Sequence, residues 1–425
     1  EPGAFLSAIN SYATRKKNIR IYLLIDEYDN FTNTILSTYG TEFYRKATHG
    51  EGFIRGFFNV IKSATTGTGA ALERLFITGV SPVTMDDVTS GFNIGTNITN
   101  DSWFNDLVGF SENELREMLE YYKEQGVLQE SIDEIVAMMK PNYDNYCFSE
   151  DTLEQCMFNS DMALYFLKSF VLHHKKPKEI VDPNIRTDFN KLAYLIKLDH
   201  GLGENFSVIK EIAEQGEIIT DIVTHFSALE MTDPSNFKSL LFYFGLLSIK
   251  GVDMVGRPIL HVPNLVVREQ LFNFLIQGYI KHDIFKIDMN KMSALFENMA
   301  FRGDWKPLFD FIANAVREQS RIREYIEGEA HIKGFLLAYL GMYRYYQLYP
   351  EYELNKGFAD FFFKPSLSVP VLPPFTYLLE VKYAKAGASE KEIRALADEA
   401  REQLLRYSED ELVAEAKAKG ELKLI

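Results

Sequence analysis

The sequence predicts a chain with α/β organisation at both ends and a helical region between them. Apolar runs of strand length occur near each end, at residues 18–25, 75–80 and 375–383, and helix-like segments lie beside them. In the middle, residues 111–279 repeat apolar positions at helical spacing. The chain has 425 residues, more than one hydrophobic core usually serves, so we expect several domains.

Composition restricts the class of protein. The two cysteines, Cys147 and Cys156, fit neither a disulfide framework nor a zinc site, which predicts a reducing, cytoplasmic compartment. The most apolar stretch, residues 240–249, is about half of the roughly 20 residues that a membrane span needs, so we expect no membrane crossing. A net charge of −15 argues against a protein that coats nucleic acid with a basic surface. It does not exclude an enzyme that holds metal ions with carboxylates.

The N-terminal elements form one expected α/β unit. We predict helices at 5–12 and 53–63 and strands at 18–25 and 75–80. Continuous apolar strands of this kind are typical of a parallel sheet, and acidic residues after such a strand lie where α/β proteins place ligands. Asp26 and Glu27 follow the first strand directly, and Thr78 and Ser81 lie at the end of the second.

The remaining elements follow the same periodicity. In the middle we predict helices at 112–122, 131–139, 161–172, 190–198, 236–247 and 267–279. Towards the C-terminus we predict a helical block at 305–347, strands at 357–363 and 375–383, a helix at 389–407 and a short strand at 421–425.

Two acidic residues and a lysine are expected to meet near the C-terminus. Side chains alternate along a strand, so Glu380 and Lys382 should point to the same side. A hairpin through residues 365–374 would bring Asp360 beside Glu380. A lone Glu-x-Lys pair has an ordinary alternative, because solvated edge strands often carry one.

This combination suits phosphodiester hydrolysis. Mg²⁺ (or Mn²⁺) prefers a few carboxylate oxygens plus waters, and Asp360 and Glu380 would supply the former. Lys382 would orient the attacking water or neutralise charge on the phosphoryl oxygens. Glu329 is a further catalytic candidate, since its spacing predicts the apolar face of a helix over 322–340.

The order of these residues resembles the core of the PD-(D/E)XK nuclease superfamily. Asp360 is followed by Glu380-Val381-Lys382 and then by a Gln-x-x-x-Tyr helix motif that begins at Gln403. Ala359 stands where the family's name has a proline. The resemblance implies a metal-dependent nuclease in which Gln403 belongs to the site, and Glu329 matches the glutamate that the family often carries on its leading helix.

The first strand resembles a Walker B strand, in which an aspartate holds Mg²⁺ and a glutamate polarises the water that attacks ATP. Asp26 and Glu27 match these two positions, Asp26 as the metal-associated one, and Thr78 and Ser81 would lie beside the γ-phosphate. The alternative is that Asp26 and Glu27 only cap a helix or form a solvated turn. A Gly-x-x-x-x-Gly-Lys-Ser/Thr loop is absent from the sequence.

Four motifs in order resemble the bacterial AAA-ATPase-like family, whose members typically end in a PD-(D/E)XK domain. The motifs are Ile25-Asp26-Glu27-Tyr28-Asp29, Ile77-Thr78-Gly79-Val80-Ser81-Pro82, Gly109-Phe110-Ser111-Glu112-Asn113-Glu114 and Tyr143-Asp144-Asn145-Tyr146. In that family a phosphate-binding loop precedes the point where this sequence begins, so ATP is an expected cofactor only if that loop is present. A degenerate ATPase is the alternative.

We therefore expect a partial AAA-ATPase-like domain at 1–110, a helical region at 111–304 and a PD-(D/E)XK nuclease-like domain at 305–425. The predicted function is Mg²⁺-dependent hydrolysis of nucleic acid, with DNA as the expected substrate, coupled to an ATPase-like unit. The alternative is an ATP-switched binding module with an inactive nuclease fold. The sequence leaves a homo-oligomer open, since ATPase sites of this class often lie at subunit interfaces.

Overall fold

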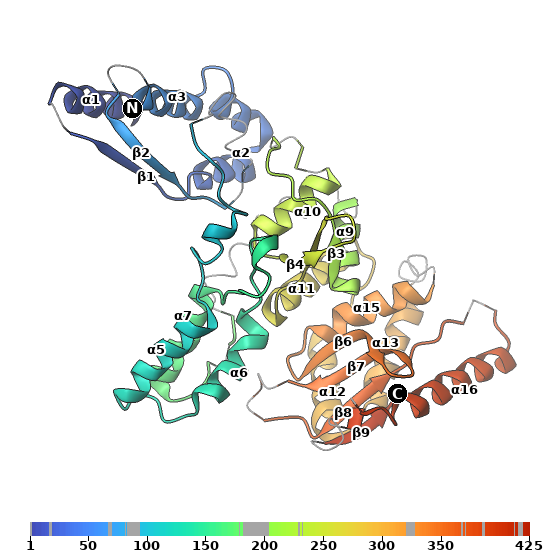
Figure 1. Ribbon diagram of the computed structural model, residues 1–425. Helices are drawn as coiled ribbons and strands as arrows, with labels where there is room; N and C mark the ends of the chain where they lie inside the picture. The colour runs from blue at the N-terminus through green and yellow to red at the C-terminus, as the bar shows by residue number, and fades with distance from the viewer. Residues whose placement is uncertain are drawn as a thin grey trace.

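Figure 1 shows the computed structural model of the chain, with three groups of elements along its length. The structure describes residues 2–16, 19–66, 70–80, 82, 94–177, 179–181, 204–227, 230–231, 233–319, 328–366, 369, 371–384, 387–411, 413–414 and 420–425. Within these residues, no helix combines the length and the apolar character needed to cross a bilayer.

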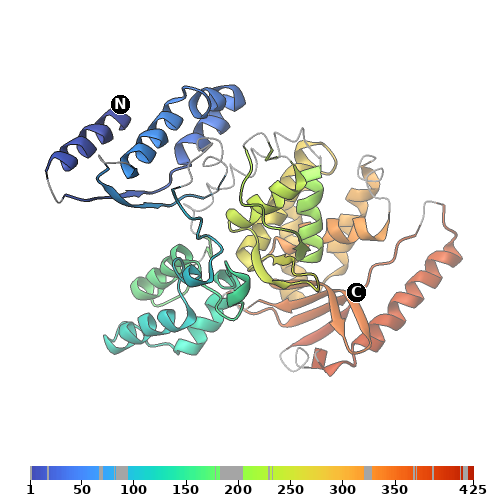
Figure 2. The ribbon, with the colours of Figure 1, turned by 45° about the horizontal axis from the view of Figure 1, so that its top comes forward.

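The N-terminal group is an α/β unit. Its elements are α1 (Pro2–Arg15), β1 (Ile21–Ile25), α2 (Asn30–Thr48), α3 (Phe53–Thr65) and β2 (Leu72–Ile77). The two strands pair in parallel, with Ile25 opposite Ile77, which confirms the predicted strand-crossover-strand order. Helices α1 and α3 lie side by side over one face of the strands (Figures 1 and 2). α3 buries Phe58 and Ile61 in the core of this unit.

A helical group follows and agrees with the predicted periodicity. It contains η1 (Ser102–Phe104), α5 (Glu112–Glu124), α6 (Ile132–Tyr143), η2 (Glu150–Thr152) and α7 (Ser160–His173). α5 begins at a capping box in which the Ser111 and Glu114 side chains each bond the other residue's backbone amide. The Asn159 side chain accepts from the Met162 amide and so caps α7. The helix predicted at 190–198 lies outside the described residues.

The next group adds a small sheet to the middle of the chain, for which the sequence predicts only helices. It contains α9 (Glu204–Gln215), β3 (Glu217–Ile219), α10 (Pro234–Tyr243), β4 (Ser248–Val252), β5 (Pro258–His261) and α11 (Leu265–Lys281). The strands form an antiparallel sheet in the order β3-β5-β4. The helix predicted to reach Leu247 ends at Tyr243, because Gly245 adopts a φ of +70° that ends the helical path.

The C-terminal group contains the second α/β unit. Its elements are α12 (Met289–Arg302), α13 (Lys306–Glu318), α15 (Glu329–Gly341), β6 (Tyr346–Leu354), β7 (Gly357–Pro365), β8 (Phe375–Leu379), α16 (Glu390–Tyr407) and β9 (Glu421–Leu424). The sheet order is β6-β7-β8-β9, antiparallel except for the parallel pair β8-β9. The helical block predicted to residue 347 was wrong at its end, because Tyr346 already pairs with Pro365 in the sheet.

Both faces of this sheet are covered. On one face Phe362 and Leu378 pack with Leu404 and Tyr407 of α16. On the other, the large core that also contains α12 and α11 residues takes in Phe361, Phe363, Tyr377 and Leu379. The Tyr377 hydroxyl donates to the carbonyl of Met299 at 2.5 Å, so α12 is part of the packing of this sheet. Hydrophobic contacts therefore continue across residue 304.

Candidate functional site

Asp360 and Glu380 lie together where β8, one of the two inner strands of the C-terminal sheet, ends beside β7. β7 and β8 run antiparallel with Phe361 opposite Leu379, which places Asp360 next to the residue that follows β8. The Val381 amide donates to Oδ2 of Asp360 at 2.6 Å. Both carboxylates are shielded from solvent, since the Asp360 side chain is 6% exposed and the Glu380 side chain 4%.

The Lys382 side chain reaches the carboxylate of Glu380. Its Nζ lies 3.1 Å from Oε1 of Glu380 and 3.6 Å from Oε1 of Glu399 on α16. Burial acts to lower the pKa of the Lys382 ammonium, but the hydrogen bond and charge of Glu380 outweigh it and raise that pKa above its usual value. Lys382 is therefore positively charged at neutral pH.

Glu380 and Gln403 each present an oxygen without a partner. Oε2 of Glu380 and Oε1 of Gln403 are buried and accept no hydrogen bond from the described residues. Burial, and then the charge of Asp360, raises the pKa of the Glu380 carboxyl above its usual range, although Lys382 acts in the opposite direction. Gln403 lies four residues after Glu399 on α16, so both side chains occupy the face that points to Lys382.

Lys333 of α15 is a site residue that the sequence reasoning missed. Its Nζ lies 2.5 Å from Oδ1 of Asp360, 3.0 Å from Oε1 of Glu351 and 3.1 Å from Oε1 of Glu329. Burial acts to lower its pKa, but the bonds to Asp360, Glu351 and Glu329 raise that pKa well above its usual value. The four-residue spacing from Glu329 to Lys333 was the available signal, because it places both on one helix face.

The position of Glu329 differs from the expectation. It was predicted on a buried apolar face, whereas its side chain is 38% exposed at the first residue of α15. A carboxylate at a helix N-terminus is stabilised by the helix dipole, so no buried partner is required there. Through Lys333 it still belongs to the group around Asp360.

Glu351 joins this group from β6 and had no sequence signal. Its φ of 44° lies in the left-handed region, which a non-glycine residue rarely adopts and which costs roughly 1–3 kcal/mol. Its neighbours Pro350 and Tyr352 pair with Phe361 and Ala359, so the strain is confined to the residue opposite Asp360.

The residues present fit a divalent cation held by two carboxylates and waters. Carboxylates outnumber ammonium groups around Asp360 and Glu380, and the partnerless Oε2 of Glu380 is an oxygen ligand of the hard type that Mg²⁺ and Mn²⁺ take. Among the described residues no group of three or more His, Cys, Asp or Glu side chains is arranged to hold a metal ion. Mg²⁺ does not need a complete cage of protein ligands, since it usually keeps several waters.

Of the four N-terminal candidate residues, the structure describes Asp26, Glu27 and Thr78. The Thr78 hydroxyl donates to Oδ1 of Asp26, so the structure brings these two residues together at the ends of β1 and β2. Glu27 has a φ of 50°, and its Oε2 accepts from the Asn30 amide group at 2.7 Å. Ser81 lies outside the described residues. In both ribbon views β1 and β2 are far from the C-terminal sheet, so the two candidate sites are separate (Figures 1 and 2).

A cavity of about 840 Å³ opens beside the end of β1. It is lined by Ile25 and Tyr28, which flank Asp26 and Glu27 in the sequence. Residues of α1 and apolar residues of α3, such as Phe57 and Val60, complete the lining. Its size falls in the range of small-molecule and cofactor sites. The lining is mostly apolar, so it offers room for a base or a similar flat group and few contacts for phosphates.

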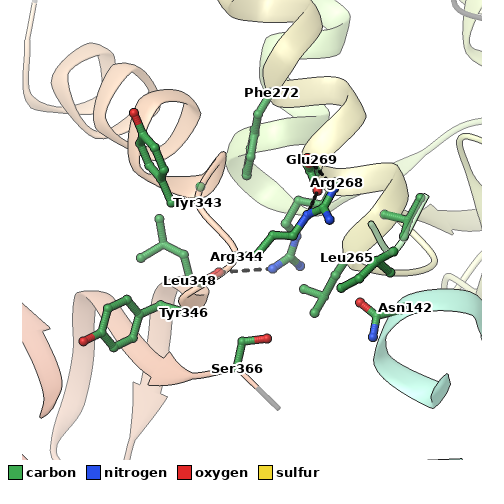
Figure 3. A pocket seen from close by; sticks show the side chains of 13 residues that line it. Asn142, Leu265, Arg268, Glu269, Phe272, Tyr343, Arg344, Tyr346, Leu348 and Ser366 are labelled. Carbon is green, nitrogen blue, oxygen red and sulfur yellow. Dashed lines mark hydrogen bonds and ion pairs between the residues drawn. The ribbon is translucent and has the colours of Figure 1, made fainter. Parts of the chain in front are cut away.

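A smaller cavity lies between α11 and β6 and does not belong to either candidate site (Figure 3). Arg344 points to Glu269 of α11 with Nε 2.9 Å from Oε2, and Arg268 donates to the Leu348 carbonyl at 3.1 Å. These bonds tie the helical middle of the chain to the first strand of the C-terminal sheet. The cavity lining includes neither Asp360 nor Glu380.

Two family models match the chain at its ends. Residues 327–425 match the model of the PD-(D/E)XK nuclease superfamily, and residues 1–89 match a model described as Predicted AAA-ATPase. Comparison with curated proteins and with solved structures gave no significant match. The C-terminal match covers β6 to β9 and hence the group formed by Asp360, Glu380 and Lys382.

Proposed function

We propose that the C-terminal domain is a Mg²⁺- or Mn²⁺-dependent nuclease that acts on DNA. One observation carries the proposal: Asp360 and Glu380 converge where β8 ends beside β7, with Lys382 bonded to Glu380, inside the segment that matches the nuclease superfamily. A nuclease superfamily domain suggests phosphodiester hydrolysis, and the choice of DNA and of metal belongs to the proposal.

In this proposal Asp360 and Glu380 hold the cation, and each other residue has a separate task. A divalent cation bound there would polarise the phosphodiester. Lys382, charged and anchored by Glu380, lies where it can orient the attacking water or neutralise charge that develops on the phosphoryl oxygens. Oε1 of Gln403, which accepts no hydrogen bond from the described residues, would accept one from that water, and Glu329 would hold Lys333 next to Asp360.

The test compares cleavage by the chain and by site variants with Mg²⁺ or Mn²⁺. Linear, circular and single-stranded DNA and RNA serve as substrates for wild type, Asp360→Asn and Glu380→Gln. Lys356→Met is the matched control, because Lys356 pairs with Glu409 on the surface away from the site. We expect DNA cleavage that both site variants lose and the control keeps. Equal cleavage by all four proteins would refute the assignment.

We also propose that Asp26, Glu27 and Thr78 serve nucleotide hydrolysis in a protein that carries a phosphate-binding loop ahead of this sequence. The Thr78-Asp26 bond and the neighbouring cavity support this role, as does the match of residues 1–89 to Predicted AAA-ATPase. Asp26 would contact the nucleotide's Mg²⁺, and Glu27 would polarise water. Ser81, which the sequence predicts beside the γ-phosphate, lies outside the described residues.

ATP titration of the loop-bearing protein separates this proposal from a purely structural unit. Glu27→Gln should bind ATP and fail to hydrolyse it, whereas Thr78→Val should weaken binding. ATP-dependent assembly without nuclease activity would instead support the alternative, an ATP-switched module that only holds a partner. Absence of nucleotide binding in that protein would count against both.

A further inference from the structure

The ammonium group of Lys333 occupies the centre of a group of carboxylates at the candidate nuclease site. Its three carboxylate contacts come from separate elements, namely Asp360 on β7, Glu351 on β6 and Glu329 on its own helix α15. The contact to Asp360, at 2.5 Å, is the shortest of the three. The Lys333 side chain is 21% exposed, so water screens these contacts only in part.

The two oxygens of Asp360 are both engaged in this arrangement. Oδ2 accepts from the Val381 amide and Oδ1 faces Lys333. Glu380, by contrast, keeps Oε2 without a partner among the described residues. A cation bound by both carboxylates could contact Oε2 of Glu380 directly. On Asp360 it would contact Oδ1, which already pairs with the Lys333 ammonium.

We propose that Lys333 is the resident counter-cation of the metal-free site and competes with the divalent cation for Asp360. The inference rests on the proposed nuclease function, because it takes Asp360 as a metal ligand. Like charges repel, and the repulsion is strong over a few ångströms at a partly shielded site. A bound divalent cation therefore requires Lys333 to withdraw from Oδ1, and Glu329 and Glu351 are the carboxylates that can retain it.

Such a counter-cation has a defined effect on folding. Without a positive partner, the nearly buried Asp360 carboxylate would carry an uncompensated charge, which destabilises the metal-free fold. Lys333 thus supports the unloaded site at the expense of metal affinity. A merely structural lysine would support the fold without opposing the metal, so metal affinity distinguishes the two roles.

The decisive experiment is Mn²⁺ titration by calorimetry on the full chain. The proteins are wild type, Lys333→Met, the control Lys356→Met, and Asp360→Asn alone and combined with Lys333→Met. We expect Lys333→Met to bind Mn²⁺ at least ~10-fold more tightly than wild type, as removal of a neighbouring like charge predicts. Lys356→Met should bind as wild type does, and Asp360→Asn should abolish binding in both backgrounds.

Thermal unfolding provides a second readout that does not depend on catalysis. Lys333→Met should unfold at a lower temperature than wild type in chelator and should gain more from Mn²⁺ than wild type gains, because the stability that a ligand adds rises with the logarithm of its affinity. If Lys333→Met does not fold in chelator, Lys333→Gln replaces it, since an amide keeps a hydrogen bond to the carboxylates without the charge. Mn²⁺ affinity of the glutamine variant should again exceed that of wild type.

The outcomes separate the inference from the function on which it rests. Asp360-dependent Mn²⁺ binding in wild type, with equal or weaker binding in the Lys333 variants, would overturn the competition while leaving the nuclease site intact. Failure of wild type and both Lys333 variants to bind Mn²⁺ would overturn the metal site and the competition together. Tighter binding that survives Asp360→Asn would place the cation elsewhere and likewise reject the inference.

Discussion

The backbone amide of Val381 donates to Oδ2 of Asp360 at 2.6 Å, so a side chain takes a hydrogen bond at the point where β8 ends. Strand pairing between β7 and β8 reaches Phe361 and Leu379 and stops there. The peptide that carries Glu380 and Lys382 is therefore held by Asp360 on one side, and on the other the Glu380 amide donates to the Ile425 carbonyl at 3.1 Å. The same aspartate anchors the loop and lies beside the carboxylate of Glu380.

Because Asp360 has both roles, its substitution by asparagine and its substitution by alanine should have different effects on stability. Asp360→Asn keeps an oxygen acceptor for the Val381 amide but loses the charge, so we expect near-normal stability and at least about 100-fold weaker cleavage. Asp360→Ala also leaves the amide and Lys333 without this partner, and should cost roughly 1–3 kcal/mol more in unfolding free energy. Urea unfolding in chelator measures this difference. Equal stability of the two variants would show that the Val381 bond contributes nothing.

Lys382 and its exposed partner Glu399 should contribute unequally to cleavage. Lys382→Met removes the ammonium next to Glu380 and should abolish cleavage while Mn²⁺ still binds. Glu399→Gln should change the rate less than ~3-fold, because Glu399 is 57% exposed and its contact to Lys382 is long at 3.6 Å. Rates at saturating metal, with Mn²⁺ affinity measured in parallel, test both. A large loss in Glu399→Gln would make Glu399 part of the site.

The packing of Tyr377 against α12 predicts where the C-terminal domain begins. A fragment that starts at residue 305 follows the boundary proposed from the sequence, but it lacks the Met299 carbonyl to which the buried Tyr377 hydroxyl donates. We expect a fragment starting at residue 204, which keeps α9, α11 and α12 in the shared core, to unfold cooperatively and the 305–425 fragment to lack a cooperative transition. Tyr377→Phe should destabilise the longer fragment by roughly 1–2 kcal/mol. Calorimetry on both fragments checks this, and a cooperative 305–425 fragment would support the original boundary.

Sequence reasoning placed Asp360 next to Glu380 because both lie on strands joined by one hairpin, and antiparallel pairing follows from local order. It extended the second strand to residue 383, whereas β8 ends at Leu379. No local pattern reports that the Asp360 side chain takes the Val381 amide, since that bond depends on the completed hairpin. A strand end that is set by a side chain of another strand depends on the tertiary fold, so the local sequence does not predict it.

For a related reason, the sequence did not predict strand β6 or the contact of Glu351 with Lys333. Tyr346 follows a helix closely and reads as its continuation, but it pairs with Pro365 across the sheet, and this contact overrides the local helical pattern. Glu351 reaches Lys333 from a left-handed backbone position that no sequence pattern indicates. The helix spacing rule could have identified Lys333, because it lies one turn after Glu329.

A final prediction concerns Glu214, a residue of α9 that packs against the helix of Lys333. A Cβ atom added at Gly334 would lie 1.7 Å from Oε1 of Glu214, so this carboxyl group rests on the backbone of α15. Burial raises the pKa of Glu214 above its ordinary value of 4.5, and the attraction of Lys210, 3.8 Å away, offsets only part of that effect. Oε1 also accepts no hydrogen bond from the described residues.

A carboxyl group with a raised pKa binds its proton more tightly in the folded state than in the unfolded state. Its contribution to stability is therefore complete below pH 4.5 and is lost as the pH rises through the raised pKa. Glu214→Gln should accordingly be more stable than wild type at pH 7, with the advantage vanishing towards pH 4. Glu204→Gln, at the exposed first residue of the same helix, is the control and should show no such pH-dependent gain. Thermal unfolding of the three proteins from pH 4 to 8 decides the matter: a constant difference between Glu214→Gln and wild type would mean that packing against Gly334, not ionisation, governs this contact.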